Sequence, residues 1–278
     1  MSVDQGPGGS RSGSPPPPTA AVPASPAPAS PPLDKGQHPV WAAVSTLLLA
    51  GFIWFVTGSW VIAGAVIWGL LVHEYGHVLA MNRYGMGPAR IYIVPFLGGM
   101  AKSQRLPDSE WDGVKVSLAG PAFGLLATLP FFAAWMVTGG SAWLVGAFAI
   151  AMLNLVNLAP APPLDGSKAL GPVLARIHPM LEKAAMVAVG VLVVAWGLSN
   201  GSYIFAGFLV LALIGHLKRG AWRPEGRALS GREAGYSVGL FLVTVVACAG
   251  VAMAALLPLA GSVEGALTQG LRYLEFGR

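Results

Sequence analysis

Long apolar runs recur along this chain and constrain its fold more than any other feature. We predict seven of them, at about 40–57, 60–82, 117–138, 142–159, 183–199, 201–217 and 237–260. Such runs match the roughly 17 to 25 apolar residues that a membrane-spanning helix needs. Only 10% of the residues are charged, against about 25% in soluble domains. The sequence therefore predicts an all-α polytopic membrane protein with about six or seven transmembrane helices.

The basic residues predict how these helices are oriented. If the N-terminus is cytoplasmic, the inner segments carry all but two of the 17 Lys and Arg residues, the exceptions being Arg272 and Arg278. An excess of positive charge in cytoplasmic loops is the usual mark of topology. The charges fall in several short loops rather than on one stripe, so we predict the lipid bilayer and no nucleic acid as partner. We expect a multi-pass protein of the cell membrane.

The composition divides the chain into three regions. Residues 1–39 are predicted to be a disordered, proline-rich cytoplasmic tail, because the first 38 residues hold 10 of the 23 prolines and lack the apolar stretch of a secretory signal. Residues 40–260 form the membrane-embedded domain, and residues 261–278 form a C-terminal tail. No loop between the spans is long enough for a folded soluble domain. We therefore expect any regulatory membrane protein to be a separate chain.

The second apolar run contains the polar segment "HEYGH" at residues 73–77. His73 and His77 are four residues apart, so a helix presents both imidazoles on one face, with Glu74 beside them. This spacing is the zinc metallopeptidase signature of two ligands and a general base. A charge at the bilayer centre costs about 2.5 to 3.5 kcal/mol, which favours a functional site over a chance polar run. Counting from Trp60 places His73 about 20 Å into a core of about 30 Å, nearer the cytoplasm.

A catalytic zinc usually takes a third protein ligand and leaves one position for water. The predicted topology brings the end of the fourth run to the same inner side, where "NLVNLAPAPPLDGSKAL" contains Asp165. Local sequence leaves two interpretations open, since Asp165 is either the third ligand or a cap of the following helix. Asn154 and Asn157 lie one helical turn apart in this run. They favour the ligand, because buried amides in a bilayer need polar partners within the bundle.

These segments resemble the site-2 protease family of intramembrane zinc metalloproteases, through "HEYGH" at 73–77 and "NLAPAPPLDG" at 157–166. The resemblance covers roughly residues 60–170 and makes residues 40–260 a metalloprotease domain. It implies one catalytic zinc ion bound by His73, His77 and Asp165. It also implies that Glu74 is the catalytic acid and base, and that Asn157 lies near the reacting peptide.

Two further segments agree with this resemblance. "RIYIVPFLGGMA" at 90–101 is similar to the family's membrane-associated strand and diglycine loop, and "SLAGPAFG" at 117–124 is similar to its small-residue motif in the third span. We therefore expect a short membrane-associated β-hairpin or strand loop. Gly98 and Gly99 lack side chains where another backbone could approach, so our hypothesis is that a substrate adds to it as a strand. A loop that only plugs the membrane is the open alternative. Ser167 departs from the family, in which many members have a second glycine.

The leading functional prediction is a zinc-dependent intramembrane endopeptidase that cleaves the transmembrane segments of membrane proteins, as in regulated intramembrane proteolysis. The alternative is a zinc-dependent transporter or sensor that uses the same ligands without proteolysis. Transporters usually carry further acids or histidines along a path through the membrane. Here the other histidines, His38, His178 and His216, lie at or near the ends of predicted spans. The sequence therefore favours the protease.

Overall fold

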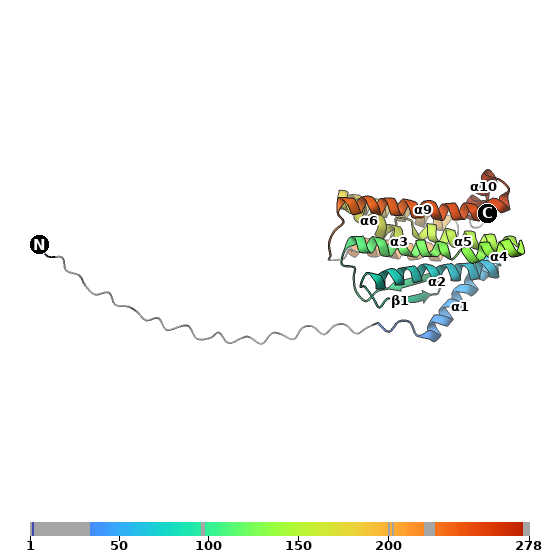
Figure 1. Ribbon diagram of the computed structural model, residues 1–278, viewed down its shortest axis with the longest axis horizontal. Helices are drawn as coiled ribbons and strands as arrows, with labels where there is room; N and C mark the ends of the chain where they lie inside the picture. The colour runs from blue at the N-terminus through green and yellow to red at the C-terminus, as the bar shows by residue number, and fades with distance from the viewer. Residues whose placement is uncertain are drawn as a thin grey trace. The chain divides into compact units, whose positions relative to one another are not determined.

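The structure, a computed structural model, describes residues 2, 34–95, 98–199, 201, 203–219 and 226–274. Most of the predicted proline-rich tail, residues 1 and 3–33, lies outside the described residues, and so do residues 275–278. The elements of the described part are shown in Figure 1. They are α1 (Pro39–Thr57), α2 (Trp60–Arg83), β1 (Arg90–Val94), β2 (Gly98–Lys102), α3 (Glu110–Leu126), α4 (Leu129–Thr138), α5 (Ser141–Asn157), α6 (Asp165–Ile177), α7 (Pro179–Ser199), α8 (Tyr203–Arg219), α9 (Gly231–Ala260) and α10 (Val263–Leu274).

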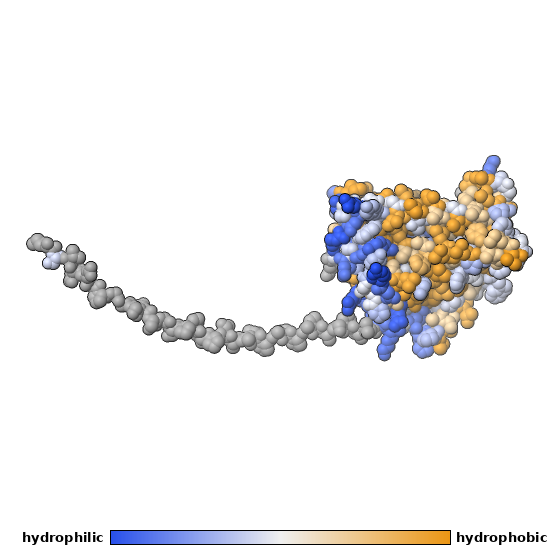
Figure 2. Space-filling view, in the orientation of Figure 1, coloured by the Kyte–Doolittle hydropathy of each residue, from blue (hydrophilic) through white to orange (hydrophobic). Residues whose placement is uncertain are grey.

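The predicted helical membrane fold is confirmed. Within the described residues, five segments are long and apolar enough to cross a membrane, namely α1, α2, α3 together with α4, α7 and α9. The apolar helix α5 and the apolar part of α8 are shorter, at Ser141–Asn157 and Ala206–Gly215. Figure 2 shows apolar residues along the sides of the helices and hydrophilic residues gathered at the end where α3 and α9 begin. This chain is therefore a multi-pass membrane protein.

The third predicted run is not one continuous helix. The helix α3 begins at Glu110, earlier than predicted, and is separated from α4 by Ala127 and Thr128. Pro130 lies in the first turn of α4, where a proline is tolerated because its missing N–H needs no partner there. The two helices together supply the length of one span.

Close packing of helices brings α2 against α3 and α5. A Cβ atom on Gly69 would lie 2.9 Å from the Ile150 side chain of α5, and one on Gly76 would lie 2.6 Å from the Ala119 carbonyl oxygen of α3. Small residues at such crossings let helix backbones approach closely in a membrane. The helix α9 packs against α3, α5 and α6 on the other side of the bundle. The polar segment of α2 is therefore enclosed by neighbouring helices.

The predicted β-hairpin is also confirmed. Strands β1 and β2 are antiparallel, with Ile93 opposite Gly99. The predicted extended segment ran to residue 96, whereas β1 ends at Val94, and residues 96 and 97 lie outside the described residues. Ile93 is buried in a cluster with Leu49 of α1 and Leu70 of α2. The hairpin therefore lies against the middle of α2, beside the polar segment.

Both ends of the membrane-embedded region carry structure that the sequence did not suggest. Residues 34–38, which we predicted as part of the disordered tail, lie against the hairpin, where Gln37 is hydrogen-bonded to Ile93. The predicted C-terminal tail contains α10, an amphipathic helix with exposed Val263 and Leu267. Such a helix is suited to lie at a membrane surface.

Candidate metal centre

Three predicted ligands from two helices meet in the interior. His73 and His77 lie in the middle of α2, and Asp165 is the first residue of α6. The two Nε2 atoms are 3.1 Å apart, and each lies 3.1 Å from Oδ2 of Asp165. The exposed fractions of these residues are 1%, 6% and 5%. The structure thus brings together the residues that the resemblance implies as ligands.

The donor set fits one zinc ion. Zinc bonds to imidazole nitrogen and carboxylate oxygen are about 2.0 to 2.2 Å long, so tetrahedral ligands lie about 3.3 Å from one another. The observed spacing of 3.1 Å among the three atoms is close to that value. Among the residues that the structure describes, this is the only group of three or more His, Cys, Asp or Glu side chains placed to hold a metal. Zinc is therefore the ion that this centre fits.

Hydrogen bonds fix the tautomers of both histidines. Nδ1 of His73 lies 2.9 Å from Oδ1 of Asn154, and Nδ1 of His77 lies 2.8 Å from the Val116 carbonyl oxygen. The Asn154 amide is oriented by its Nδ2, which donates to the Ile150 carbonyl. Both partners of the imidazoles are acceptors, so each Nδ1 carries the hydrogen and donates it. The Nε2 lone pairs are left free to bind a metal.

Replacing Asn154 by Leu should weaken zinc binding about 10- to 100-fold, the usual effect of losing a partner that orients a histidine ligand. Leucine has a similar volume but cannot accept the Nδ1 hydrogen of His73. The affinity can be measured by competition with a chromogenic chelator in detergent. Asn157→Leu is the matched control, because Asn157 donates to the Leu153 carbonyl instead. Equal zinc affinities of the native protein and Asn154→Leu would contradict this role.

The loop before α6 orients Asp165. The Leu164 N–H donates to the Ala161 carbonyl, which closes a turn directly before the ligand. A Cβ on Gly166 would lie 2.7 Å from the Ala159 carbonyl carbon, so the turn requires a glycine there. Ser167 donates its hydroxyl to the Leu164 carbonyl at 2.7 Å, which accommodates the departure from the family pattern. Leu164 occupies the N-cap position of α6, and the carboxylate of Asp165, the first residue of the helix, faces the histidines.

Glu74 lies between the ligands and the hairpin. It follows His73 in α2 and is 6% exposed. A Cβ on Gly99 would lie 2.7 Å from Cγ of Glu74 and 3.2 Å from its Oε1. The absence of a side chain at Gly99 therefore lets β2 approach the carboxylate closely. Glu74 directly follows the ligand His73 in α2, and its catalytic role stays a prediction.

The structure adds two residues that the sequence did not single out for the site. A Cβ on Gly120 of α3 would clash with Nε2 of His77 and lie 2.9 Å from Nε2 of His73. A Cβ on Gly124, one turn later, would lie 2.6 Å from Cγ of Asn154. The spacing of the two glycines was visible in the sequence, but it indicates only close helix packing. In this structure Gly120 packs against the ligands His73 and His77, and Gly124 packs against Asn154, the amide that orients His73.

The structure gives less direct evidence for the residues that we predicted to bind the substrate, namely Asn157, Gly98 and Gly99. Asn157 is half-buried, and its role near the reacting peptide stays a prediction. Gly98 has a φ of +115°, a conformation that favours glycine, at the start of β2. Gly99 lies against Glu74. Nζ of Lys168, on a side chain about half exposed, lies 3.8 Å from Oδ1 of Asp165 and adds positive charge at the edge of the centre.

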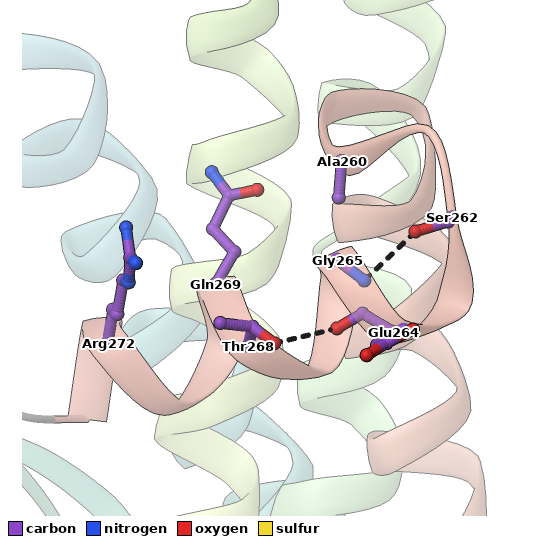
Figure 3. A pocket seen from close by; sticks show the side chains of 7 residues that line it. All are labelled: Ala260, Ser262, Glu264, Gly265, Thr268, Gln269 and Arg272. Carbon is purple, nitrogen blue, oxygen red and sulfur yellow. Dashed lines mark hydrogen bonds between the residues drawn. The ribbon is translucent and has the colours of Figure 1, made fainter.

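A pocket at the C-terminal end of the described region is separate from the metal centre (Figure 3). It lies between the end of α9 and α10, and two of its hydrogen bonds join Gly265 to Ser262 and Thr268 to the Glu264 carbonyl. Its lining contains no histidine and none of the three ligands. It consists of Ala260, Ser262, Glu264, Gly265, Thr268, Gln269 and Arg272. This pocket therefore contains none of the residues predicted to bind the metal.

Comparison with known sequences finds a matching family and several relatives of this chain. The profile of Peptidase family M50 matches residues 61–144, which include both histidines and Glu74. Zinc metalloprotease MJ0392 of Methanocaldococcus jannaschii is 25% identical over 156 residues, which cover 49% of this chain and 44% of the relative. Putative zinc metalloprotease Rip3 of Mycobacterium tuberculosis is 28% identical over 188 residues, or 59% of this chain and 45% of the relative.

A third relative, putative zinc metalloprotease sll0528 of Synechocystis, is 28% identical over 128 residues, which cover 43% of this chain and 32% of the relative. The chain thus spans less than half the length of each of these curated relatives. The segment matched by the family profile contains HEYGH at 73–77, whereas the motif with Asp165 at 157–166 lies beyond that segment. The resemblance to the site-2 protease family is confirmed.

Proposed function

We propose that this chain, which matches Peptidase family M50 over residues 61–144, is a membrane zinc metalloprotease that cleaves the transmembrane segments of other membrane proteins. The observation that carries this proposal is the convergence of His73, His77 and Asp165 inside a bundle of apolar helices, with Glu74 beside them. A buried metal centre in a membrane helix is positioned for a peptide bond that is itself within the membrane.

Different residues around the metal centre would bind the metal, orient its ligands and transfer protons. When bound, zinc supplies Lewis acidity, which polarises a peptide carbonyl and makes a water molecule more acidic. The Glu74 carboxylate would accept the proton of the attacking water and deliver it to the leaving nitrogen. Asn154 and Val116 hold the two imidazoles in the tautomer that leaves their Nε2 atoms free. The chain's own side chains thus provide both the ligands and the proton transfer.

The hairpin would hold the substrate in an extended form. The amides of a transmembrane helix are bonded within the helix, so a substrate must unwind before its peptide bond can react. A strand edge offers replacement hydrogen bonds to an unwound segment. Strand β2 passes directly beside Glu74 at Gly99. A segment added to this hairpin would therefore lie close to the metal centre.

We also propose that the N-terminus is cytoplasmic and that the centre lies nearer the cytoplasmic face. The hydrophilic end of the helical bundle in Figure 2 supports this orientation. It is the end where α3 and α9 begin. The distribution of basic residues favours the same side. Any regulatory subunit would be a separate membrane protein at this surface.

The direct test is cleavage of a single-span membrane protein by the purified chain in liposomes. Removing the metal with a chelator should lower the cleavage rate at least about 100-fold, because the centre supplies several kcal/mol of transition-state stabilisation. Returning one equivalent of zinc should restore the rate. Undiminished cleavage by a sample shown to be free of zinc would refute the proposal. Tight zinc binding without cleavage of any single-span substrate would instead support the transporter or sensor.

A further inference from the structure

The side chain of Gln37 occupies the outer edge of β1. Its Oε1 accepts a hydrogen bond from the Ile93 N–H at 2.9 Å, and its Nε2 donates to the Ile93 carbonyl at 3.1 Å. These are the two backbone groups that a neighbouring β-strand would bond. Nε2 of Gln37 also lies 3.3 Å from Oγ of the buried Ser45 in α1. The glutamine thus takes the place of a strand at this position and is held by α1.

The same bonds define which edge of the hairpin is open. In an antiparallel pair, opposed residues either bond each other through both backbone groups or point both groups outward. The backbone N–H and carbonyl of Ile93 point away from β2, toward Gln37. Gly99 lies opposite Ile93, so its own N–H and carbonyl point away from β1. No hydrogen bond from the described residues outside the hairpin reaches these groups of Gly99. The open edge of the described hairpin is therefore that of β2, the strand whose Gly99 lies against Glu74.

Asp34 fixes the same segment to both strands. Its carboxylate accepts hydrogen bonds from Nζ of Lys102 in β2, at 2.8 Å, and from the Tyr92 hydroxyl of β1. Its N–H donates to Oε1 of Gln104 at 3.0 Å. The Lys102 ammonium and the Tyr92 hydroxyl hold the pKa of Asp34 well below its ordinary value, so it stays ionised at neutral pH. Residues 34–37 thus contact both strands of the hairpin.

We propose that residues 34–37, here called the strap, close the β1 edge and confine an incoming substrate strand to the β2 edge, with Gln37 as the positioning residue. This inference rests on the proposed protease function, because it concerns how that enzyme would orient its substrate. The strap gives the hairpin a single open edge. The edge that stays open belongs to β2, the strand that contacts Glu74 at Gly99.

Hydrogen exchange tests the closed edge without any substrate. In the full-length, zinc-loaded protein, Gln37→Ala should speed exchange of the Ile93 amide at least about tenfold, because an edge amide without its acceptor opens to solvent. Gln37→Glu keeps the acceptor for this amide and should retain most of its protection. His38→Ala is the control, since His38 caps α1 through Val40 and has no bond to the hairpin. Unchanged exchange in Gln37→Ala would overturn the inference.

Crosslinking tests where the substrate binds. A short photoreactive side chain is placed either at Arg90 of β1 or at Met100 of β2, both exposed, in a Glu74→Gln background that does not consume the substrate. A strand added to β2 lies about 5 Å from β2 and about 10 Å from β1, so a single-span substrate should crosslink at Met100 at least about fivefold more than at Arg90. Adding Gln37→Ala should raise crosslinking at Arg90.

The outcomes separate this inference from the proposed function. Equal crosslinking at Arg90 and Met100 with an intact strap, for a substrate that the native protein cleaves, would overturn the inference alone. A purely structural role of Gln37 would lower crosslinking at both positions without redistributing it, which also contradicts the inference. A native protein that neither cleaves nor captures a substrate would refute the protease, while hydrogen exchange would still decide whether Gln37 closes the β1 edge.

Discussion

Glu74→Gln should lower the rate of substrate cleavage about 100- to 10,000-fold, the usual contribution of a positioned general acid or base. Glutamine preserves the shape of the side chain against Gly99 but cannot accept the proton of the attacking water. The ligand atoms of His73, His77 and Asp165 are unaffected by the change. Zinc content should therefore remain at the native value. Initial cleavage rates and metal analysis of the same preparation would measure both quantities.

Glu264→Gln is the control for the loss of a carboxylate. Glu264 is an exposed residue of α10, at the pocket of Figure 3, and the metal centre does not include it. This variant should cleave at the native rate. If Glu74→Gln also cleaved at the native rate, Glu74 would not be the base, and the mechanism proposed for this centre would be wrong.

Gly120→Ala should strongly weaken zinc binding, although Gly120 is not a ligand. The new methyl group would clash with Nε2 of His77 and lie 2.9 Å from Nε2 of His73, at the two atoms that bind the metal. The helix α3 cannot easily retreat from α2, because α6 and α9 also pack against it. Displaced ligands lower metal affinity at least about 10- to 100-fold. The zinc content per chain after dialysis should fall from about one to about one tenth or less.

Gly64→Ala is the matched control for adding a methyl group to a helix glycine. Gly64 belongs to α2, and a Cβ there meets no atom within 4 Å. Alanine is favoured over glycine in a helix by about 1 kcal/mol, so this variant should fold and bind zinc normally. Full zinc occupancy in Gly120→Ala would contradict the close approach of α3 to the ligands.

The parts of the site that depend on local spacing were predictable. His73 and His77 share a helix face because they are one turn apart, whatever surrounds the helix. Asp165 was predictable as a candidate because the topology returns the fourth run to the same side of the membrane. The structure places it with both histidines and without a capping role. The hairpin was predictable from its extended segment and diglycine.

The parts that depend on contacts between helices were not predictable. Asn154 and Asn157 lie about one helical turn apart in α5. Only the packing of α5 against α2 makes Asn154 the partner of His73, which is 81 residues away in the sequence. The spacing of Gly120 and Gly124 indicates a close helix crossing but not which side chains lie there. Gln37 belongs to a segment whose composition indicates disorder. Its contact with β1 arises from the tertiary structure.

The most direct test of zinc-dependent cleavage within the membrane is the mass of the two fragments released from a single-span substrate in liposomes. Zinc-loaded native protein should produce fragments whose new ends lie inside the apolar segment, and neither the Glu74→Gln variant nor the metal-free protein should produce them. Fragments that end only in the soluble flanks of the substrate, or that form equally with Glu74→Gln, would contradict this prediction.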